Sequence, residues 1–243
     1  MVLSRLPATL ELASLAIALT LGVLFAVASV CWRGRWPEFM VDIFCAVALA
    51  IPDFFWGLTF ILVLGVLLPV MPISGRLDPA LDFNPMTQFF LAESLLRGEL
   101  RVFASLISHL ILPALALALP LAAMIARVLK NSLNEAMNQD YILLARVKGF
   151  TRSRIIWREA LRNALIPTVA LTGVQFTFLI GGTVLIEYIF AYPGIGNMAI
   201  GAVLQRDLPL IQGLVLTFAV LFIAINFLID ASYHWLNPRV RQR

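Results

Sequence analysis

The stretch Asn131–Asn163, NSLNEAMNQDYILLARVKGFTRSRIIWREALRN, decides the fold of this chain, because it is a charged and patterned segment between two long apolar runs. Asn138 and Asp140 carry side-chain oxygens that can cap a short helix beginning near Tyr141. Gly149 can adopt the left-handed backbone conformation that ends such a helix. The pattern therefore predicts an ordered helical turn at this point, in place of a flexible linker.

A second helix is predicted after this turn, capped by Thr151 or Ser153. Arg154, Arg158 and Arg162 are spaced four residues apart, so they share one face of that helix and form a basic stripe. Two amphipathic helices of this kind suit two roles: they can rest on anionic lipid headgroups, or they can dock a cytoplasmic partner. The residues alone leave both roles open.

The composition around this segment is that of a membrane protein. Hydrophobic residues make up 61% of the chain and charged residues 13%, whereas soluble domains have about 45–50% and about 25%. A bilayer accepts this surface if every backbone polar group is satisfied internally, as in a helix. The apolar runs are long and uninterrupted, unlike the short alternating strands of a membrane barrel. We therefore expect an all-α polytopic membrane protein with one domain over residues 1–243.

Five apolar stretches are long enough to span the hydrocarbon, which takes about 20 helical residues. They cover about residues 9–32, 41–71, 107–128, 164–190 and 208–236, with the loop at about 131–163 on the cytoplasmic side. The second stretch is too long for one upright helix. We expect one tilted helix kinked at Pro52, since an interior proline removes a backbone hydrogen bond. The competing interpretation is a short interfacial helix followed by a span.

The basic residues set the expected orientation. Of the 18 Lys and Arg residues, five lie in one set of predicted loops, namely Arg5, Arg76, Arg97, Arg101 and Arg206. The other set should be cytoplasmic by the positive-inside rule, and it holds Arg33, Arg35, Arg127, Lys130, Arg146, Lys148, Arg152, Arg154, Arg158, Arg162, Arg239, Arg241 and Arg243. The C-terminus is then cytoplasmic and the N-terminus lies outside. Because these charges flank apolar runs, we expect no nucleic-acid partner.

Three carboxylates fall in or near the predicted spans, where ionisable groups are functional candidates. Asp53 lies mid-span or at the interface, depending on where its helix begins. Glu187 is near the outer end of the fourth span, where a pathway role and an interfacial role are both open. Asp230, toward the inner end of the fifth, can pair with a nearby arginine or a partner subunit. His109 and His234 stand alone, so no metal site is predicted.

In motifs that run almost end to end, the chain resembles the permease subunits of ABC importers, and among them the B-type permeases of the dipeptide, oligopeptide and nickel branch. These motifs are DYILLARVKGF at 140–150, REALRNALIP at 158–167, GGTVLIEYIFAYPGIG at 181–196, RDLPLIQG at 206–213, LNPRVR at 236–241, LPATLELA at 6–13 and AIPDFFWG at 50–57. Where the general motif has Glu-Ala-Ala, this chain has Leu143, Leu144 and Ala145, and the peptide branch of the family often lacks that Glu. Such permeases usually begin with one more span, so the resemblance implies that this chain lacks their usual first span.

The resemblance implies a five-span type I permease core in a bacterial inner membrane, importing peptides or, alternatively, nickel, glutathione or oligosaccharides. It implies a second permease, two ATPase subunits that bind ATP and Mg, and an extracytoplasmic binding protein. This chain has no G-x-x-x-x-G-K-[ST] segment, so no ATPase activity of its own is expected. A secondary transporter or channel would predict internal repeats, and we find no convincing repeat. An intramembrane protease would need a recognisable catalytic motif.

The resemblance also implies which residues couple to the ATPase. Gly149 would set the angle between the two short helices, and Ile142 and Ile155 would carry the buried contact with the partner. The full predicted set is Asp140, Tyr141, Ala145, Arg146, Lys148, Gly149, Arg154 and Arg158.

Overall fold

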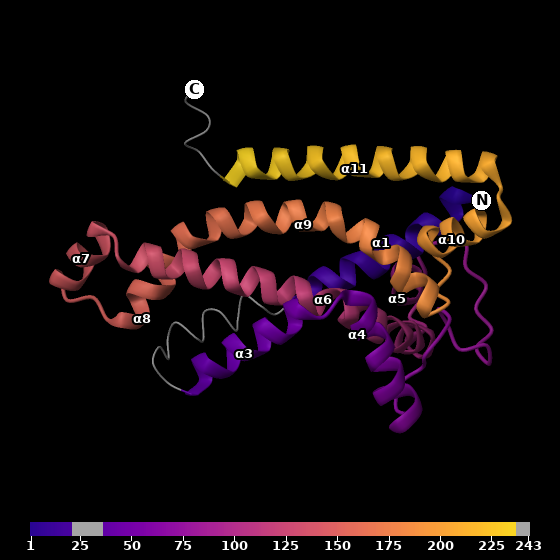
Figure 1. The fold of residues 1–243 in the computed structure, drawn as a ribbon, viewed down its shortest axis with the longest axis horizontal. Coiled ribbons are helices and arrows are strands. Elements are labelled where there is room, and N and C mark those ends of the chain that lie inside the picture. Colours follow the sequence, from indigo (N-terminus) through magenta and orange to yellow (C-terminus); the bar gives the residue numbers. More distant parts are fainter. Residues whose placement is uncertain (21–35, 237–243) are drawn as a thin grey trace. The chain divides into compact units, whose positions relative to one another are not determined.

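The computed structural model describes residues 1–20 and 36–236, and every regular element in those ranges is a helix. This agrees with the all-α prediction. The elements in Figure 1 are α1 (Val2–Ala18), α3 (Trp36–Ala50), α4 (Asp53–Phe60), the π-helical η1 (Ile61–Leu67), α5 (Phe90–Leu96), α6 (Leu100–Met137), α7 (Asp140–Val147), α8 (Arg152–Arg154), the π-helical η2 (Ile155–Ala160), α9 (Leu161–Ile189), α10 (Ile195–Gln205) and α11 (Leu208–Leu236).

The longest apolar helices lie where spans were predicted. Within the described ranges, α6 and residues 208–229 of α11 are long and apolar enough to cross a bilayer, and α3 with α4 and η1 adds a third crossing if that broken pair counts as one. α9 covers the fourth predicted stretch. The first predicted span, about residues 9–32, overlaps α1 and then leaves the described part of the chain. The count of five spans stays a prediction.

Pro52 interrupts the second predicted span completely. α3 ends at Ala50 and α4 begins at Asp53, with Pro52 in an extended conformation at φ −60° and ψ 151°. The amides of Phe55 and Trp56 donate to the Pro52 carbonyl at 3.1 and 3.2 Å, which starts the new helix. The expected single kinked helix is therefore wrong. A proline disfavours helical geometry in the residue before it and lacks the N–H that would continue the ladder.

One compact unit is formed by residues 1–19, 51–119 and 177–223. In it α1 packs against α10, and Ile195, Ala202 and Leu214 form a buried cluster with side chains of α1, α10 and α11. α4 approaches α9 closely at Gly57, where a Cβ would lie 3.2 Å from both Ile186 and Phe190. Small residues allow this approach between membrane helices.

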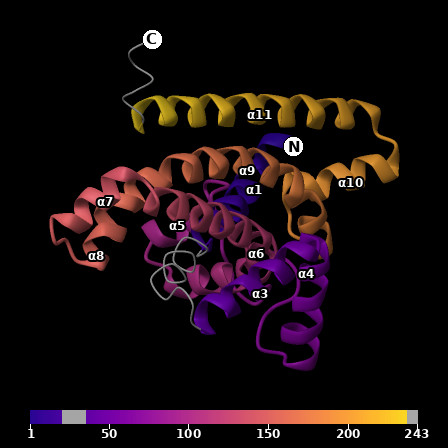
Figure 2. The same cartoon turned by 60° about the vertical axis from the view of Figure 1, so that its left-hand side comes forward.

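The second compact unit takes residues 20–50, 120–176 and 224–243. Lys130 of α6 bridges to α3 through Asp42 at 2.7 Å and Glu38 at 3.1 Å. α9 approaches α11 at Gly173, where a Cβ would lie 2.5 Å from Ile229. α7 packs against η2, and α7 and α8 lie side by side in both views (Figures 1 and 2). This unit holds the turn that follows α6.

Candidate functional site

The turn after α7 is fixed by one glycine. Gly149 has φ +74° and nothing lies within 4 Å of the position a Cβ would take. Its amide donates to the Arg146 carbonyl at 2.9 Å, and the Phe150 amide donates to the Ala145 carbonyl at 3.2 Å, which satisfies the end of α7. Glycine is thus required by the left-handed backbone and not by crowding. The predicted role of Gly149 in ending this helix is confirmed.

The helix starts differ in part from the prediction. Gln139 is the N-cap of α7 and makes no side-chain capping hydrogen bond, so the expected caps at Asn138 and Asp140 are wrong. Asp140 is the first helical residue, where a negative charge still favours the helix dipole. Thr151 accepts a hydrogen bond from the Arg154 amide at 3.4 Å and caps α8, as one of the two predicted alternatives.

The second arm of the turn is the beginning of α9 and not a separate short helix. α8, η2 and α9 follow one another without a gap from Arg152 to Ile189. No glycine or proline stands between Arg152 and Ile166, so nothing in the chain ends the helix there. α6 likewise continues to Met137, beyond its predicted span. The expected loop of residues 131–163 is therefore mostly helix, and its short independent element is α7.

Burial separates two faces of α7. Ile142 is fully buried and Ile155 of η2 is 2% exposed, whereas Leu143, Leu144 and Val147 are 61%, 55% and 78% exposed. The prediction that Ile142 and Ile155 face a partner is wrong, because both side chains are used inside this chain. We call the set Leu143, Leu144 and Val147 the α7 apolar face. Sequence reasoning missed it, although helical spacing places Leu143 and Val147 on one side.

The predicted coupling residues are mostly on the surface. Ala145 is 6% exposed and packs inward beside Ile142. The Arg154 guanidinium lies over the Phe150 ring at 4.0 Å, a cation–π contact that holds the turn. The exposed members of the predicted set are Asp140, Tyr141, Arg146, Lys148, Gly149, Arg154 and Arg158.

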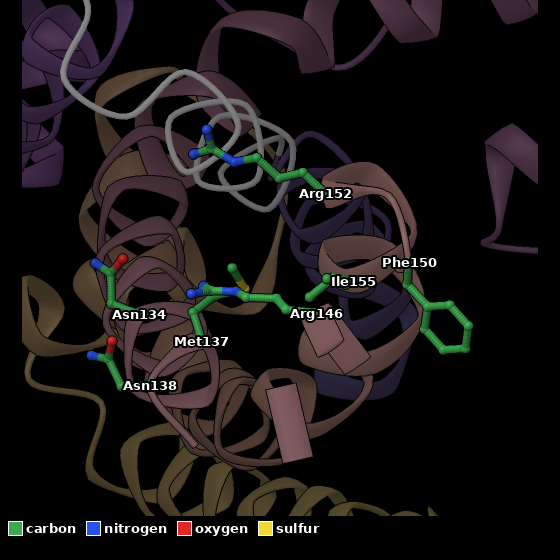
Figure 3. Close-up of a pocket in the computed structure, with 7 residues that line it drawn as sticks. All are labelled: Asn134, Met137, Asn138, Arg146, Phe150, Arg152 and Ile155. Atoms are coloured by element: carbon green, nitrogen blue, oxygen red, sulfur yellow. The ribbon is translucent and has the colours of Figure 1, made fainter. Parts of the chain in front are cut away.

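A cleft of about 390 Å³ opens between the end of α6 and the turn (Figure 3). Arg146 reaches across it toward Asn134 and Met137, while Phe150 points away. The residues that line it are Asn134, Met137, Asn138, Arg146, Phe150, Arg152 and Ile155. A recess lined by two arginines, two asparagines and three apolar side chains therefore adjoins the helix that bears the α7 apolar face.

Glu187 is fully buried and joins three helices. Its carboxylate accepts hydrogen bonds from the Thr9 hydroxyl at 2.6 Å and from the amides of Gly196 and Asn197 at 2.8 and 3.1 Å. Thr9 in turn accepts from the Ile195 amide at 2.9 Å. The carboxylate caps the N-terminus of α10, where free amides and the helix dipole favour an anion. Glu187 is thereby committed to holding α1, α9 and α10 together.

Another carboxylate, that of Glu11 in α1, is bound in a buried ion pair. Glu11 and Arg76 are each 7% exposed at the side chain, with 2.6 Å between Oε2 and Nη2. Arg76 also donates to the Gln88 carbonyl at 2.8 Å and lies over the Phe90 ring at 3.7 Å. The Leu91 amide donates to the other Glu11 oxygen at 2.9 Å. These bonds tie α1 to residues 76–91.

Glu93 organises the same segment. Its carboxylate accepts from the amides of Met86 and Thr87 at 2.6 and 2.7 Å and pairs with Arg97. Burial works against the charge of Glu93, but these hydrogen bonds, the Thr87 hydroxyl and Arg97 outweigh it and lower its pKa to about 2. Nearby, burial raises the pKa of Tyr192, whose hydroxyl has no hydrogen-bond partner within the described structure.

Asp53 stands apart from these satisfied carboxylates. It is half-buried at the start of α4, and one oxygen accepts from the Phe54 amide at 2.7 Å. The other oxygen lies 3.2 Å from where a Cβ of Gly182 would be. Asp230 belongs to α11, but its side chain lies outside the described residues.

The described part of the chain holds no group of three or more His, Cys, Asp or Glu side chains that could bind a metal. His109 instead lies 2.8 Å from the Ser105 carbonyl of its own helix.

Comparison with known proteins gives consistent matches. Residues 18–242 match the family described as "Binding-protein-dependent transport system inner membrane component". The di/tripeptide transport system permease protein of Pseudomonas aeruginosa is 40% identical over 99% of this chain and 72% of its own length. The dipeptide transport system permease protein of Escherichia coli K12 is 37% identical over 98% of this chain and 72% of its own length. Inward-facing structures of the MetNI methionine ABC transporter include a chain with a TM-score of 0.63 and 17% identity, covering 97% of this chain and 94% of that one.

Proposed function

Because this chain belongs to the family of binding-protein-dependent transport system inner membrane components, we propose that it forms half of the translocation pathway of a peptide importer. It is a permease subunit of an ABC transporter with the type I permease fold. The relatives at 37–40% identity are named as permeases for dipeptides or for di- and tripeptides. Short peptides are therefore the proposed substrates, ahead of nickel, glutathione or oligosaccharides.

The proposed partners are a second permease, two cytoplasmic ATPase subunits and an extracytoplasmic binding protein. The family description, which names a binding-protein-dependent system, supports the last of these. ATP and Mg are assigned to the ATPase subunits, since this sequence contains no G-x-x-x-x-G-K-[ST] loop to cradle phosphates. The basic residues around the turn support a cytoplasmic position for α7 and the C-terminus, with Met1 on the outer side.

The observation that carries the coupling role is the α7 apolar face. Its three side chains are 55–78% exposed, in a segment whose flanking charges favour a position outside the hydrocarbon. Burial of one such side chain is worth about 1.5–3 kcal/mol. A groove on an ATPase subunit is the proposed recipient, with the nearby arginines setting the orientation. A short amphipathic helix in an apolar groove is a recurrent mode of recognition.

Packing supports a direct route from α7 to the membrane. On the inner face of α7, Ile142 and Ala145 are 0% and 6% exposed. They lie where α7 packs against η2, in which Ile155 and Ile156 are 2% and 1% exposed. From η2 the chain continues without a gap into α9. A displacement of α7 by a closing ATPase pair would therefore move α9 without an intervening flexible loop.

The test is to place a charge on the α7 apolar face. Leu143→Asp with Val147→Asp should abolish co-purification of the ATPase subunits and ATP-driven uptake, because a buried charge in the groove is costly. Leu96→Asp on α5 is the matched control, since Leu96 is 88% exposed and belongs to the other compact unit. Membrane insertion should be normal for both variants. ATPase recovery equal to wild type in the double variant would refute the proposed docking.

A further inference from the structure

Three carboxylates of the first unit, those of Glu11, Asp53 and Glu187, belong to its helices or end beside them, and two of the three are saturated with donors. Glu187 accepts from one hydroxyl and two amides. Glu11 binds the guanidinium of Arg76 and one amide. Asp53 has only the amide of its own neighbour, Phe54. Among the described residues no Lys, Arg or His forms an ion pair with Asp53, and its Oδ2 accepts no hydrogen bond.

The neighbours of Asp53 place it at membrane depth. A Cβ on Gly182 would lie 3.2 Å from Asp53 Oδ2 and 3.8 Å from Leu117 Cδ2, so all three residues meet at one point. Leu117 is 3% exposed and lies near the middle of the predicted span at about 107–128. Gly182 belongs to the predicted span at about 164–190. Although α4 begins at Asp53, these two neighbours favour a position within the predicted membrane over an interfacial one.

A half-buried carboxylate at this depth is expected to face a partner cation or a water-filled cavity. The break at Pro52 has the same implication, because irregular backbone at membrane depth is tolerated where it is buried in protein or lines a cavity. The second oxygen of Asp53 faces Gly182, which has no side chain to cover it, and the Cβ position of the adjacent Gly181 has nothing within 4 Å. The carboxylate thus has one oxygen available for a cation.

We propose that Asp53 binds the α-ammonium group of the peptide as it passes through the membrane, an inference that rests on the proposed peptide transport. A peptide with a free N-terminus carries this cation at neutral pH, since the α-amino pKa is about 7.7–8.0. The peptide supplies the countercharge that the described chain does not. Asp53 is then a specificity residue for the N-terminus of the substrate, while the binding protein makes the first selection outside.

The test uses the complete transporter in proteoliposomes, with uptake measured per peptide-loaded binding protein. Two substrates are compared: a dipeptide, and its isosteric analogue with a hydroxyl in place of the α-amino group. Asp53→Asn keeps an oxygen that can accept from the Phe54 amide, so α4 can still begin normally. Asp82→Asn, an exposed carboxylate outside the predicted spans, is the matched control. Because one binding protein loads every variant, its own preference cancels in the comparison.

Asp53→Asn should lower dipeptide uptake at least tenfold and uptake of the hydroxyl analogue less than threefold. Asp53→Glu should recover part of the dipeptide uptake, and Asp82→Asn should change neither. Equal losses for both substrates, or no loss for either, would overturn the proposal and leave peptide transport itself established by the wild-type uptake. Loss of the second permease from the purified complex would also overturn it, since Asp53 would then pair with that subunit. Absence of dipeptide uptake by the wild type would instead refute the proposed function.

Discussion

Replacing Glu187 by alanine should strongly destabilise the unit formed by α1, α9 and α10. The carboxylate is fully buried and serves the Thr9 hydroxyl and the amides of Gly196 and Asn197. Each buried donor left unpaired costs about 1–3 kcal/mol. The hydroxyl can rotate to another acceptor but the amides cannot, so the two amides alone predict a loss of about 2–6 kcal/mol.

The assay is thermal unfolding of the purified subunit in lipid nanodiscs. For a chain of this size about 2–4 °C is lost per kcal/mol, and Glu187→Gln, which keeps one acceptor oxygen, should lose less than half as much as Glu187→Ala. Gly194→Ala should act on the same bonds, because its Cβ would overlap the Glu187 carboxylate. In a double-mutant cycle the two losses should therefore not add. Full additivity, or a Glu187→Ala loss below about 1 kcal/mol, would refute the assigned capping role.

Three further outcomes are expected. Gly149→Ala should reduce ATP-driven uptake, because a left-handed residue with a Cβ costs about 1–2 kcal/mol. Gly98→Ala, with φ +72° and similar open space, should carry the same strain without loss of ATPase binding. Equal effects of the two variants on ATPase recovery would contradict the role of the Gly149 turn in docking. The pKa of Glu93 is lowered from 4.5 to about 2, so the stabilising effect of its charge is complete above pH 4.5 and is lost as the pH falls toward 2. Glu93→Gln should remove this pH dependence, measured by limited proteolysis of the purified subunit. A pH profile equal to that of the wild type would contradict the link between Glu93 and stability. Arg76→Met should lower the stability of the subunit more than the double variant Arg76→Met with Glu11→Gln, because the single change leaves a buried carboxylate unpaired. Thermal unfolding of both variants checks this, and a lower midpoint for the double variant would contradict it.

Local backbone rules predicted the turn well. Gly149 and Thr151 act as their residue types and positions require, because a left-handed helix end and a side-chain cap depend on neighbours in the sequence. Long apolar helices were equally visible, since a bilayer demands runs of about 20 residues. The break at Pro52 was located, but a complete interruption was not distinguished from a kink.

Contacts between distant segments could not be predicted in this way. Ile142 and Leu143 are both apolar and adjacent, and only the packing of α7 on η2 decides that the first is buried and the second exposed. Glu187 was a pathway or interfacial candidate until Thr9 and Gly196 were placed beside it. Thr9 is 178 residues away from Glu187, so no local pattern signals their hydrogen bond.

Site-specific photo-crosslinking tests the central claim most directly. A photoreactive amino acid is placed at Val147, which is 78% exposed on the α7 apolar face, or at Ile142, which is fully buried five residues earlier. Irradiation of the assembled transporter should join the Val147 variant to an ATPase subunit and should leave the Ile142 variant without that product. Crosslinking of Val147 to lipid alone, or equal crosslinking from both positions, would contradict the assignment of this face to the ATPase.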